Sequence, residues 1–184
     1  LRDQVTIVMQ DQFLFSDTIA ENINYGNREA NPRFIRDMAS VADAENFIEE
    51  MPEGYDTVVG ERGVGLSGGQ KQRISLTRAL VKDPSILILD DTTSALDMET
   101  EAKIQKELRR ITKDKTTFII ATRISSIRQA DQIIVLQHGR IIERGTHEEL
   151  LAKHGYYYDT YQKQLGALGV TPDAPQAEEA VTNG

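Results

Sequence analysis

The stretch "LSGGQKQRISLTRALVKDPSILILDD", residues 66–91, decides the fold of this chain. It opens with a serine and two glycines, continues with apolar residues at helical spacing until Pro84, and closes with a short apolar run that ends in two aspartates. A serine before a periodic run predicts the start of a helix, and a proline predicts its stop. We therefore expect a loop that enters a helix, followed by a buried strand at 85–90.

The segments on either side of this stretch alternate between short strands and helices. The predicted elements are a strand in "VTIVMQ", a helix in "FSDTIAENINYG" capped by Ser16 or Asp17, a helix at 31–51 behind Asn31, a helix at 99–112, a strand at 116–121, a helix at 123–129, strands at 132–137 and in "IIE", and two helices within 146–166. Such alternation indicates an α/β fold with a parallel sheet. The polar tail from residue 171 is expected to be disordered.

Composition limits the classes of function. The 184 residues suit one domain, and 29 acidic against 21 basic residues give a formal net charge of -8, which opposes adhesion to nucleic acid. We therefore expect no nucleic-acid partner.

The absence of cysteine excludes disulfides and thiolate metal sites. No run reaches the roughly 18 apolar residues of a membrane span, and Leu1 is expected to lie inside a longer protein without a leader.

Ser67, Gly68 and Gly69 stand where a helix begins, which suits the binding of an anion. The first N–H groups of a helix lack intrahelical acceptors, the helix dipole adds partial positive charge, and glycines let the backbone approach the anion closely. The competing interpretation is an ordinary capped helix after a glycine turn.

The full stretch 66–91 resembles the signature motif and Walker B segment of an ATP-binding cassette (ABC) ATPase. Further segments match this family in order: the Q-loop in "IVMQDQFLFSDTIAENI", the exporter X-loop in "GERG" at 60–63, the D-loop in "SALD" at 94–97, and the closing segment in "DQIIVLQHGRIIERGTHEELL". The resemblance covers residues 5–165. It implies a partial P-loop NTPase fold, with a mostly parallel sheet flanked by helices and an α-helical signature subdomain.

The resemblance also divides the chain into parts. They are a core strand leading into the Q-loop at 1–10, a helical subdomain with the X-loop and signature at 11–83, the C-terminal part of the ATPase core at 84–168, and a tail at 169–184. The implied ligands are ATP and Mg²⁺. The implied location is the cytoplasmic face of the cell membrane, as part of an integral membrane transporter.

Two residues near the strand ends are implied in metal binding. Asp90 would hold Mg²⁺ mainly through its water shell, because Mg²⁺ keeps several waters beside phosphates. Gln10 would reach the metal and the attacking water. The plainer interpretations are a strand-end carboxylate that caps the next turn and an ordinary glutamine after a strand.

The resemblance implies two protein partners. A second nucleotide-binding domain would receive the signature residues, which are Ser67, Gly68, Gly69 and Gln70, and Asp97 would lie near that partner's nucleotide. Asp97 is also a candidate N-cap, and both roles can hold at once. A membrane domain would contact the loops that carry Gln10 and Glu61, although Glu61 could equally be a solvated turn carboxylate. His138 and His147 have no partners at metal-ligand spacing, and we interpret both as structural.

Two residues depart from the family pattern. Active members end the strand with an Asp-Glu pair and follow the next strand with a histidine, whereas this chain has Asp91 and Thr122 at these catalytic positions. Asp is one methylene shorter than Glu, and a misplacement of about 1 Å can cost on the order of 100-fold in rate. Thr122 has no imidazole. The sequence therefore predicts a site that binds ATP and hydrolyses it poorly.

The chain also contains no G-x-x-x-x-G-K-[ST] loop, so the isolated fragment is expected to bind ATP weakly. The leading hypothesis is one subunit of a heterodimeric ABC exporter, with an impaired site of its own and an intact signature for its partner. The alternatives are a homodimer with two slow sites in which Asp91 acts as the base, a soluble ABC-type ATPase, and a non-enzymatic interaction module. The transported substrate stays open.

Overall fold

The structure is a computed structural model that describes residues 4–11, 13–60 and 65–167. The chain divides into two compact units, Leu1–Thr122 and Arg123–Gly184. The predicted tail at 169–184 and Glu61 lie outside the described residues. The four parts predicted from the resemblance remain a prediction.

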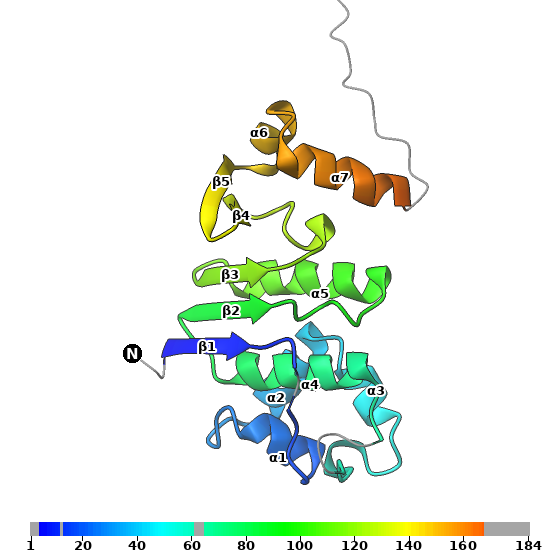
Figure 1. The fold of residues 1–184 in the computed structure, drawn as a ribbon. Coiled ribbons are helices and arrows are strands. Elements are labelled where there is room, and N and C mark those ends of the chain that lie inside the picture. Colours follow the sequence, from blue (N-terminus) through cyan, green and yellow to red (C-terminus); the bar gives the residue numbers. More distant parts are fainter. Residues whose placement is uncertain (1–3, 12, 61–64, 168–184) are drawn as a thin grey trace, which may run out of the picture. The chain divides into compact units, whose positions relative to one another are not determined.

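The first unit is built on a three-stranded parallel sheet. Its strands are β1 (Val5–Val8), β2 (Ile86–Asp90) and β3 (Thr116–Ile120), hydrogen-bonded in the order β1-β2-β3. The three arrows point the same way in Figure 1. Because parallel strands share one carboxyl edge, the residues that follow each strand gather there. The predicted parallel sheet is confirmed in this unit.

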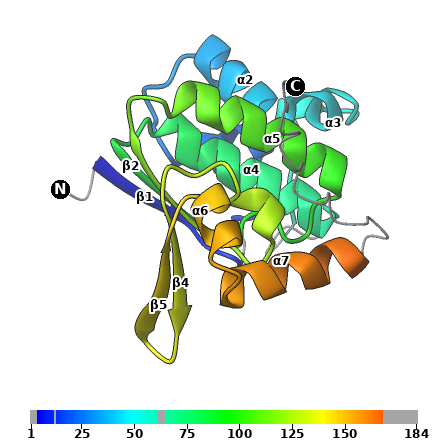
Figure 2. The same cartoon turned by 90° about the horizontal axis from the view of Figure 1, so that it is seen from above.

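Helices cover one face of this sheet. α4 (Gly68–Val81) and α5 (Met98–Ile111) lie together on one side of the strands in Figure 2. Leu87 and Leu89 point to the helices and are almost fully buried. The opposite face carries Ile7, Phe118 and Ile120, whose side chains are all more than half exposed. The alternation along the strands thus separates a covered face from an open one.

A helical layer connects β1 to α4. It consists of α1 (Ile19–Asn24), α2 (Pro32–Val41), α3 (Glu45–Glu49) and the short 3₁₀ turn η2 (Gly54–Asp56). The single helix predicted at 31–51 is wrong, because Asp43 adopts a left-handed φ of 53° and ends α2 before α3 begins. The predicted helix start behind Asn31 is confirmed, and the Asn31 side chain caps α2 by accepting from the Phe34 N–H at 2.8 Å.

The cap of α1 also differs from the expectation. Thr18 is the N-cap, and its hydroxyl accepts from the Glu21 N–H at 3.1 Å. Asp17 instead accepts the N–H of Thr18 itself, so its carboxylate supports the turn before the helix. A local run of Ser, Asp and Thr offers three chemically suitable caps, and sequence spacing does not choose among them.

The second unit combines a hairpin with two helices. Strands β4 (Ile133–Gln137) and β5 (Arg140–Gly145) pair antiparallel through a turn in which His138 and Gly139 have positive φ. α6 (His147–Ala152) and α7 (Tyr156–Ala167) follow.

Two predictions for this unit differ from the structure. The sequence places the strand at 132–137 within the parallel alternation, whereas in the structure this strand pairs antiparallel with β5, the next strand in the chain. The predicted helix at 123–129 is wrong, because only the 3₁₀ turn η4 (Ile124–Ser126) forms, and the Ile124 N–H donates to the Gln164 side chain.

A small core holds the second unit together. Ile124, Ile133, Leu150 and Tyr157 are buried in it. His147 Nδ1 lies 2.8 Å from the Tyr157 hydroxyl, and burial lowers the pKa of the His147 imidazole. This packing agrees with a structural role for His147. Within the described part of the chain, no helix has the length and apolar character needed to cross a bilayer.

Candidate functional site

The carboxyl edge of the parallel sheet gathers the residues predicted for catalysis and metal binding. Gln10 follows β1 by two residues, Asp90 and Asp91 end and follow β2, and Thr122 follows β3 by two residues. Gln10 Nε2 donates to Asp91 Oδ2 at 3.3 Å. The pairing of β1 with β2 thereby brings together residues that are 81 positions apart in the sequence.

Asp91 is held in a specific backbone conformation. Its φ is 47°, in the left-handed region, which Asp adopts more readily than most residues. Its N–H donates to the Ile120 carbonyl at 2.8 Å, and its carbonyl accepts from the Ser94 hydroxyl at 3.0 Å. These bonds tie the turn after β2 to β3 on one side and to the D-loop segment, residues 94–97, on the other.

Asp90, Asp91 and Gln10 form a donor set that suits Mg²⁺. Their carboxylate and amide oxygens are the hard ligands that this ion takes, and Asp90 is half-buried at the strand end. Among the described residues, no group of three His, Cys, Asp or Glu side chains could enclose a metal without other ligands. Mg²⁺ held by Asp90 and Gln10 would take its other ligands from phosphate oxygens and water.

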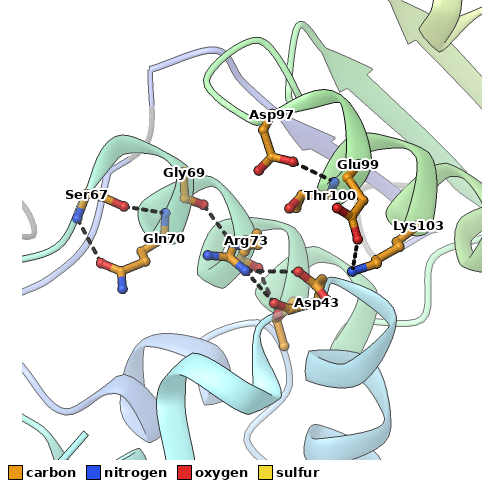
Figure 3. A network of polar contacts seen from close by, with 10 residues as sticks. Asp43, Ser67, Gly69, Gln70, Arg73, Asp97, Glu99, Thr100 and Lys103 are labelled. Carbon is orange, nitrogen blue, oxygen red and sulfur yellow. Dashed lines mark hydrogen bonds and ion pairs between the residues drawn. The ribbon is translucent and has the colours of Figure 1, made fainter. Parts of the chain in front are cut away.

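The signature residues begin α4 with a reciprocal cap. Ser67 Oγ accepts from the Gln70 N–H at 3.2 Å, and Gln70 Oε1 accepts from the Ser67 N–H at 2.9 Å, as Figure 3 shows. Ser67 and Gly68 are exposed. This capping box holds the Ser67 hydroxyl at the helix start beside the first-turn N–H groups, which lack intrahelical acceptors. Both the capped-helix interpretation and the anion site are compatible with this geometry.

Asp97 caps α5 in the same manner. Its Oδ1 accepts from the Thr100 N–H at 2.9 Å, and this hydrogen bond lowers the pKa of the Asp97 carboxyl (Figure 3). The predicted N-cap is confirmed. The carboxylate is exposed, so the cap leaves an oxygen facing solvent. The role of Asp97 near a partner's nucleotide stays a prediction.

The signature helix and the D-loop segment pack directly on each other. A Cβ built on Gly69 would lie 3.1 Å from Leu96 Cδ2 and 3.4 Å from the Ala95 carbonyl oxygen. The buried Gln72 side chain accepts from the Ala95 N–H at 3.3 Å. The glycine at position 69 therefore serves close packing as well as any approach to an anion.

Arg73 fixes the first turns of α4 to the corner between α2 and α3. Its Nη1 donates to the Asp43 carbonyl at 2.6 Å and to the Asp43 carboxylate at 3.1 Å, and its Nε donates to the Gly69 carbonyl at 3.4 Å (Figure 3). The guanidinium also lies over the Phe47 ring, 4.5 Å from its centre. The sequence interpretation did not assign Gln72 or Arg73. The available signal was that α4 is apolar on several sides, so its polar residues need partners within the fold.

An aromatic cluster lies on the segment that follows Gln10. The ring centres of Phe13 and Phe15 are 5.0 Å apart, and those of Phe15 and Tyr25 are 4.7 Å apart. All three side chains are exposed. Exposed aromatic side chains in contact with one another are typical of protein interaction surfaces.

Comparisons with known proteins identify the family to which this fold belongs. Residues 1–94 match the sequence model of the family described as ABC transporter, which is 94 of the 184 residues. The described elements also superpose on the structure of a bacterial Atm1-family ABC exporter with ATP bound, with a TM-score of 0.86 and 45% identity over 89% of this chain and 29% of that one. The chain belongs to the ABC transporter family, as an ATP-binding domain of the P-loop NTPase type.

Its curated relatives are longer proteins. The uncharacterised ABC transporter ATP-binding protein YknU of Bacillus subtilis (strain 168) is 56% identical over 164 residues, and a putative multidrug export ATP-binding/permease protein of Staphylococcus aureus (strain bovine RF122 / ET3-1) is 52% identical over 164 residues. Each match covers 89% of this chain and 28% of the relative. The chain thus spans little more than a quarter of the relatives that it matches.

Proposed function

We propose that this chain is part of the ATP-binding subunit of a heterodimeric ABC exporter at the cytoplasmic face of the membrane. In this proposal its signature residues complete the hydrolytic site of a second nucleotide-binding domain. Its own site, at the carboxyl edge of the sheet, binds ATP and Mg²⁺ and turns ATP over poorly. Bound Mg²⁺ would stabilise the charge on the phosphate oxygens beside Asp90 and Gln10.

The observation that carries the proposal is a contrast between two ends of the same unit. The start of α4 keeps a complete capping box and two glycines, with Ser67 exposed. The edge of the sheet carries Asp91 and Thr122, which depart from the family's acid and histidine. Since ABC sites join the signature of one domain to the strand edge of the other, the changes impair one composite site and spare the second.

Asp91 keeps a negative charge near the site, but its side chain is shorter than the glutamate of active family members. Its carboxylate accepts from Gln10 at 3.3 Å, so it can hold a polar environment for a water molecule. A side chain that is shorter by one methylene places its oxygens too far back, and a positioned general base is worth about 10²- to 10⁴-fold in rate. Thr122, which is exposed at the next strand, supplies neither a base nor a cation for the terminal phosphate.

The proposed membrane partner would dock on the segment after Gln10. The aromatic cluster of Phe13, Phe15 and Tyr25 offers an apolar surface there, next to the exposed carboxylates of Asp17 and Glu21. A helix end with apolar and basic side chains fits this surface. The relatives described as export ATP-binding/permease proteins support such a partner.

The proposal is tested by ATPase activity of the full heterodimer. Ser67→Arg should lower turnover by about 100-fold or more, because a bulky cation replaces the hydroxyl at the anion site of the partner's ATP. Asp91→Ala should change turnover by less than about 2-fold, because Asp91 contributes little to the rate-carrying site. Steady-state phosphate release measures both.

Two matched variants separate catalysis from helix capping. Ser67→Asp preserves the N-cap yet repels phosphate, so it should abolish turnover with an unchanged unfolding midpoint. Ser67→Thr keeps the hydroxyl and should retain most activity. If Asp91→Ala were the damaging change and Ser67→Arg the harmless one, the heterodimer assignment would fail.

The hydrogen bond between Gln10 and Asp91 also favours a second candidate, a homodimer in which Asp91 is a slow base. This candidate requires that Asp91→Asn abolish steady-state turnover in the purified homodimer. A heterodimer in which Asp91→Asn leaves turnover intact excludes it.

A further inference from the structure

Arg78 lies on α4, ten residues after Gly68, and reaches across to the segment that follows Gln10. Its Nε donates to the Asn22 carbonyl at 2.6 Å, its Nη2 to Asn22 Oδ1 at 2.9 Å, and its Nη1 to the Phe13 carbonyl at 2.9 Å. The guanidinium also lies over the Phe15 ring, 5.6 Å from its centre. One side chain of the signature helix therefore holds three residues of a distant segment.

Asn22 is the centre of this contact. It is only 1% exposed, and its amide donates to the carbonyls of Phe15 and Thr18 at 3.0 Å. Its Oδ1 accepts from the Phe15 N–H at 2.8 Å as well as from Arg78. The turn that carries the aromatic cluster is thereby folded around the group that Arg78 binds.

The backbones of the two segments also touch. A Cβ built on Gly26, two residues after α1, would lie 2.2 Å from the Arg78 carbonyl oxygen, so the chain at the end of α1 lies directly against the backbone of α4. Separation of the two segments would break the hydrogen bonds between Arg78 and Asn22, and any of these polar groups that stayed buried would lack a partner, which is costly.

Within the described residues, no carboxylate forms an ion pair with Arg78. Partial burial lowers the pKa of its guanidinium, and three of its N–H groups donate to neutral oxygens. The Arg78 side chain is partly buried, and removing a charge from water is unfavourable unless its donors find acceptors within the fold. The planar fork of an arginine reaches all three acceptors at once, whereas the single ammonium group of a lysine does not.

We infer that Arg78 is a positioning residue that makes residues 13–25 and the signature helix move as one body. This inference rests on the proposed function, in which residues 13–25 carry the surface for the membrane domain. A displacement of that surface would then be transmitted through Arg78 to Ser67 and Gly69 at the start of α4. Arg78 contacts neither the sheet-edge residues nor the start of α4 in the described hydrogen bonds, so it acts through other residues.

The test uses the full-length transporter with its partner subunit in lipid nanodiscs. Arg78→Lys should lower kcat by about 10-fold or more with KM for ATP within about 2-fold, because nucleotide still binds while the signature is misplaced. Trapping with Mg²⁺, ATP and vanadate should change amide hydrogen exchange of residues 13–25 in the wild type. That change should shrink at least by half in Arg78→Lys.

Arg110→Lys is the matched control, since Arg110 is exposed on α5 and, among the described residues, forms an ion pair with Glu107 alone. It should match the wild type in both readouts. Asn22→Ser keeps a hydroxyl acceptor and is the milder second variant; if Arg78→Lys does not assemble, a reduced exchange response in Asn22→Ser supports the inference and an unchanged response overturns it.

The outcomes separate the two proposals. If the wild type hydrolyses ATP and Arg78→Lys retains its kcat and exchange response, the inference on Arg78 is wrong and the proposed function stands. Equal losses in Arg78→Lys and Arg110→Lys would also overturn the inference, because they would report general destabilisation. If the wild-type complex neither hydrolyses ATP nor responds to vanadate trapping, the proposed function and the inference fall together.

Discussion

Asp91 meets a specific backbone requirement, and in the proposed function its side chain is too short for catalysis. Its left-handed φ of 47° places the carboxylate beside Gln10 and turns the chain toward the D-loop segment. Asp tolerates this backbone region better than most residues. The backbone conformation is therefore compatible with Asp at this position and gives no reason for a longer side chain. In the proposed function, the deficit is one of side-chain length, which a single added methylene would correct.

This deficit predicts a gain of function. In the heterodimer carrying Ser67→Arg, which should silence the partner's site, the further changes Asp91→Glu and Thr122→His should raise turnover by about 100-fold, because they restore an acid of full length and an imidazole. Phosphate release in single-turnover and steady-state experiments measures the effect. The control Thr122→Ser with Asp91→Glu should recover only part of it. If none of these variants gained turnover, this result would contradict the assignment, in which Asp91 and Thr122 are the residues that impair the site.

At the scale of elements, α4 is the part of the first unit to which the others attach. Gln72 contacts the D-loop segment, Arg73 contacts the corner at Asp43, and Arg78 contacts the segment after Gln10. Its apolar residues, among them Ile74 and Leu80, are buried against the sheet and the helical layer. Helix propensity alone does not place such a helix; its contacts on several sides do.

The tight contact between α1 and α4 predicts a measurable loss of stability. Gly26→Ala should lower the free energy of unfolding by about 1 to 3 kcal/mol, because the new Cβ meets the Arg78 carbonyl oxygen at 2.2 Å and the backbones must move apart. Urea unfolding followed by circular dichroism measures this. Gly166→Ala in α7 is the control, since nothing lies within 4 Å of its Cβ, and it should be neutral or slightly stabilising. Equal stability of the two variants would show that α1 and α4 are not tightly packed.

At the scale of the whole molecule, charge separates the proposed exporter from a nucleic-acid-linked ATPase. The formal net charge is -8, and the guanidinium groups of Arg73 and Arg78 bind oxygen atoms within the fold. An acidic surface repels phosphate backbones, so the attraction that drives non-specific binding is missing.

We therefore expect no saturable binding of duplex DNA or RNA below about 100 μM at physiological salt, the weak end of ordinary non-specific affinity. Fluorescence anisotropy of a labelled duplex, titrated with this chain at two salt concentrations, measures it. Tight binding that weakens steeply with salt would favour the soluble ABC-type ATPase over the exporter.

Several features could be predicted because they depend on neighbouring residues. The cap at Ser67, the cap at Asp97 and the strand at Ile86–Asp90 follow from local patterns, and the structure confirms them. The predictions were wrong where contacts between residues far apart in the sequence decide whether a helix continues. The break at Asp43 depends on its contact with Arg73, and the turn at Ile124–Ser126 depends on Gln164, forty residues further on. Spacing within a window carries no information on such partners.

The sequence by itself determined the family, the order of the motifs and the identity of the departing residues Asp91 and Thr122, because these are properties of residue types at given positions. Tertiary structure alone decided that Gln10 meets Asp91, that Gly69 packs on Leu96, and that Arg78 holds Asn22. Parallel pairing brings strand ends together regardless of their distance in sequence, and close packing selects which buried polar groups find partners.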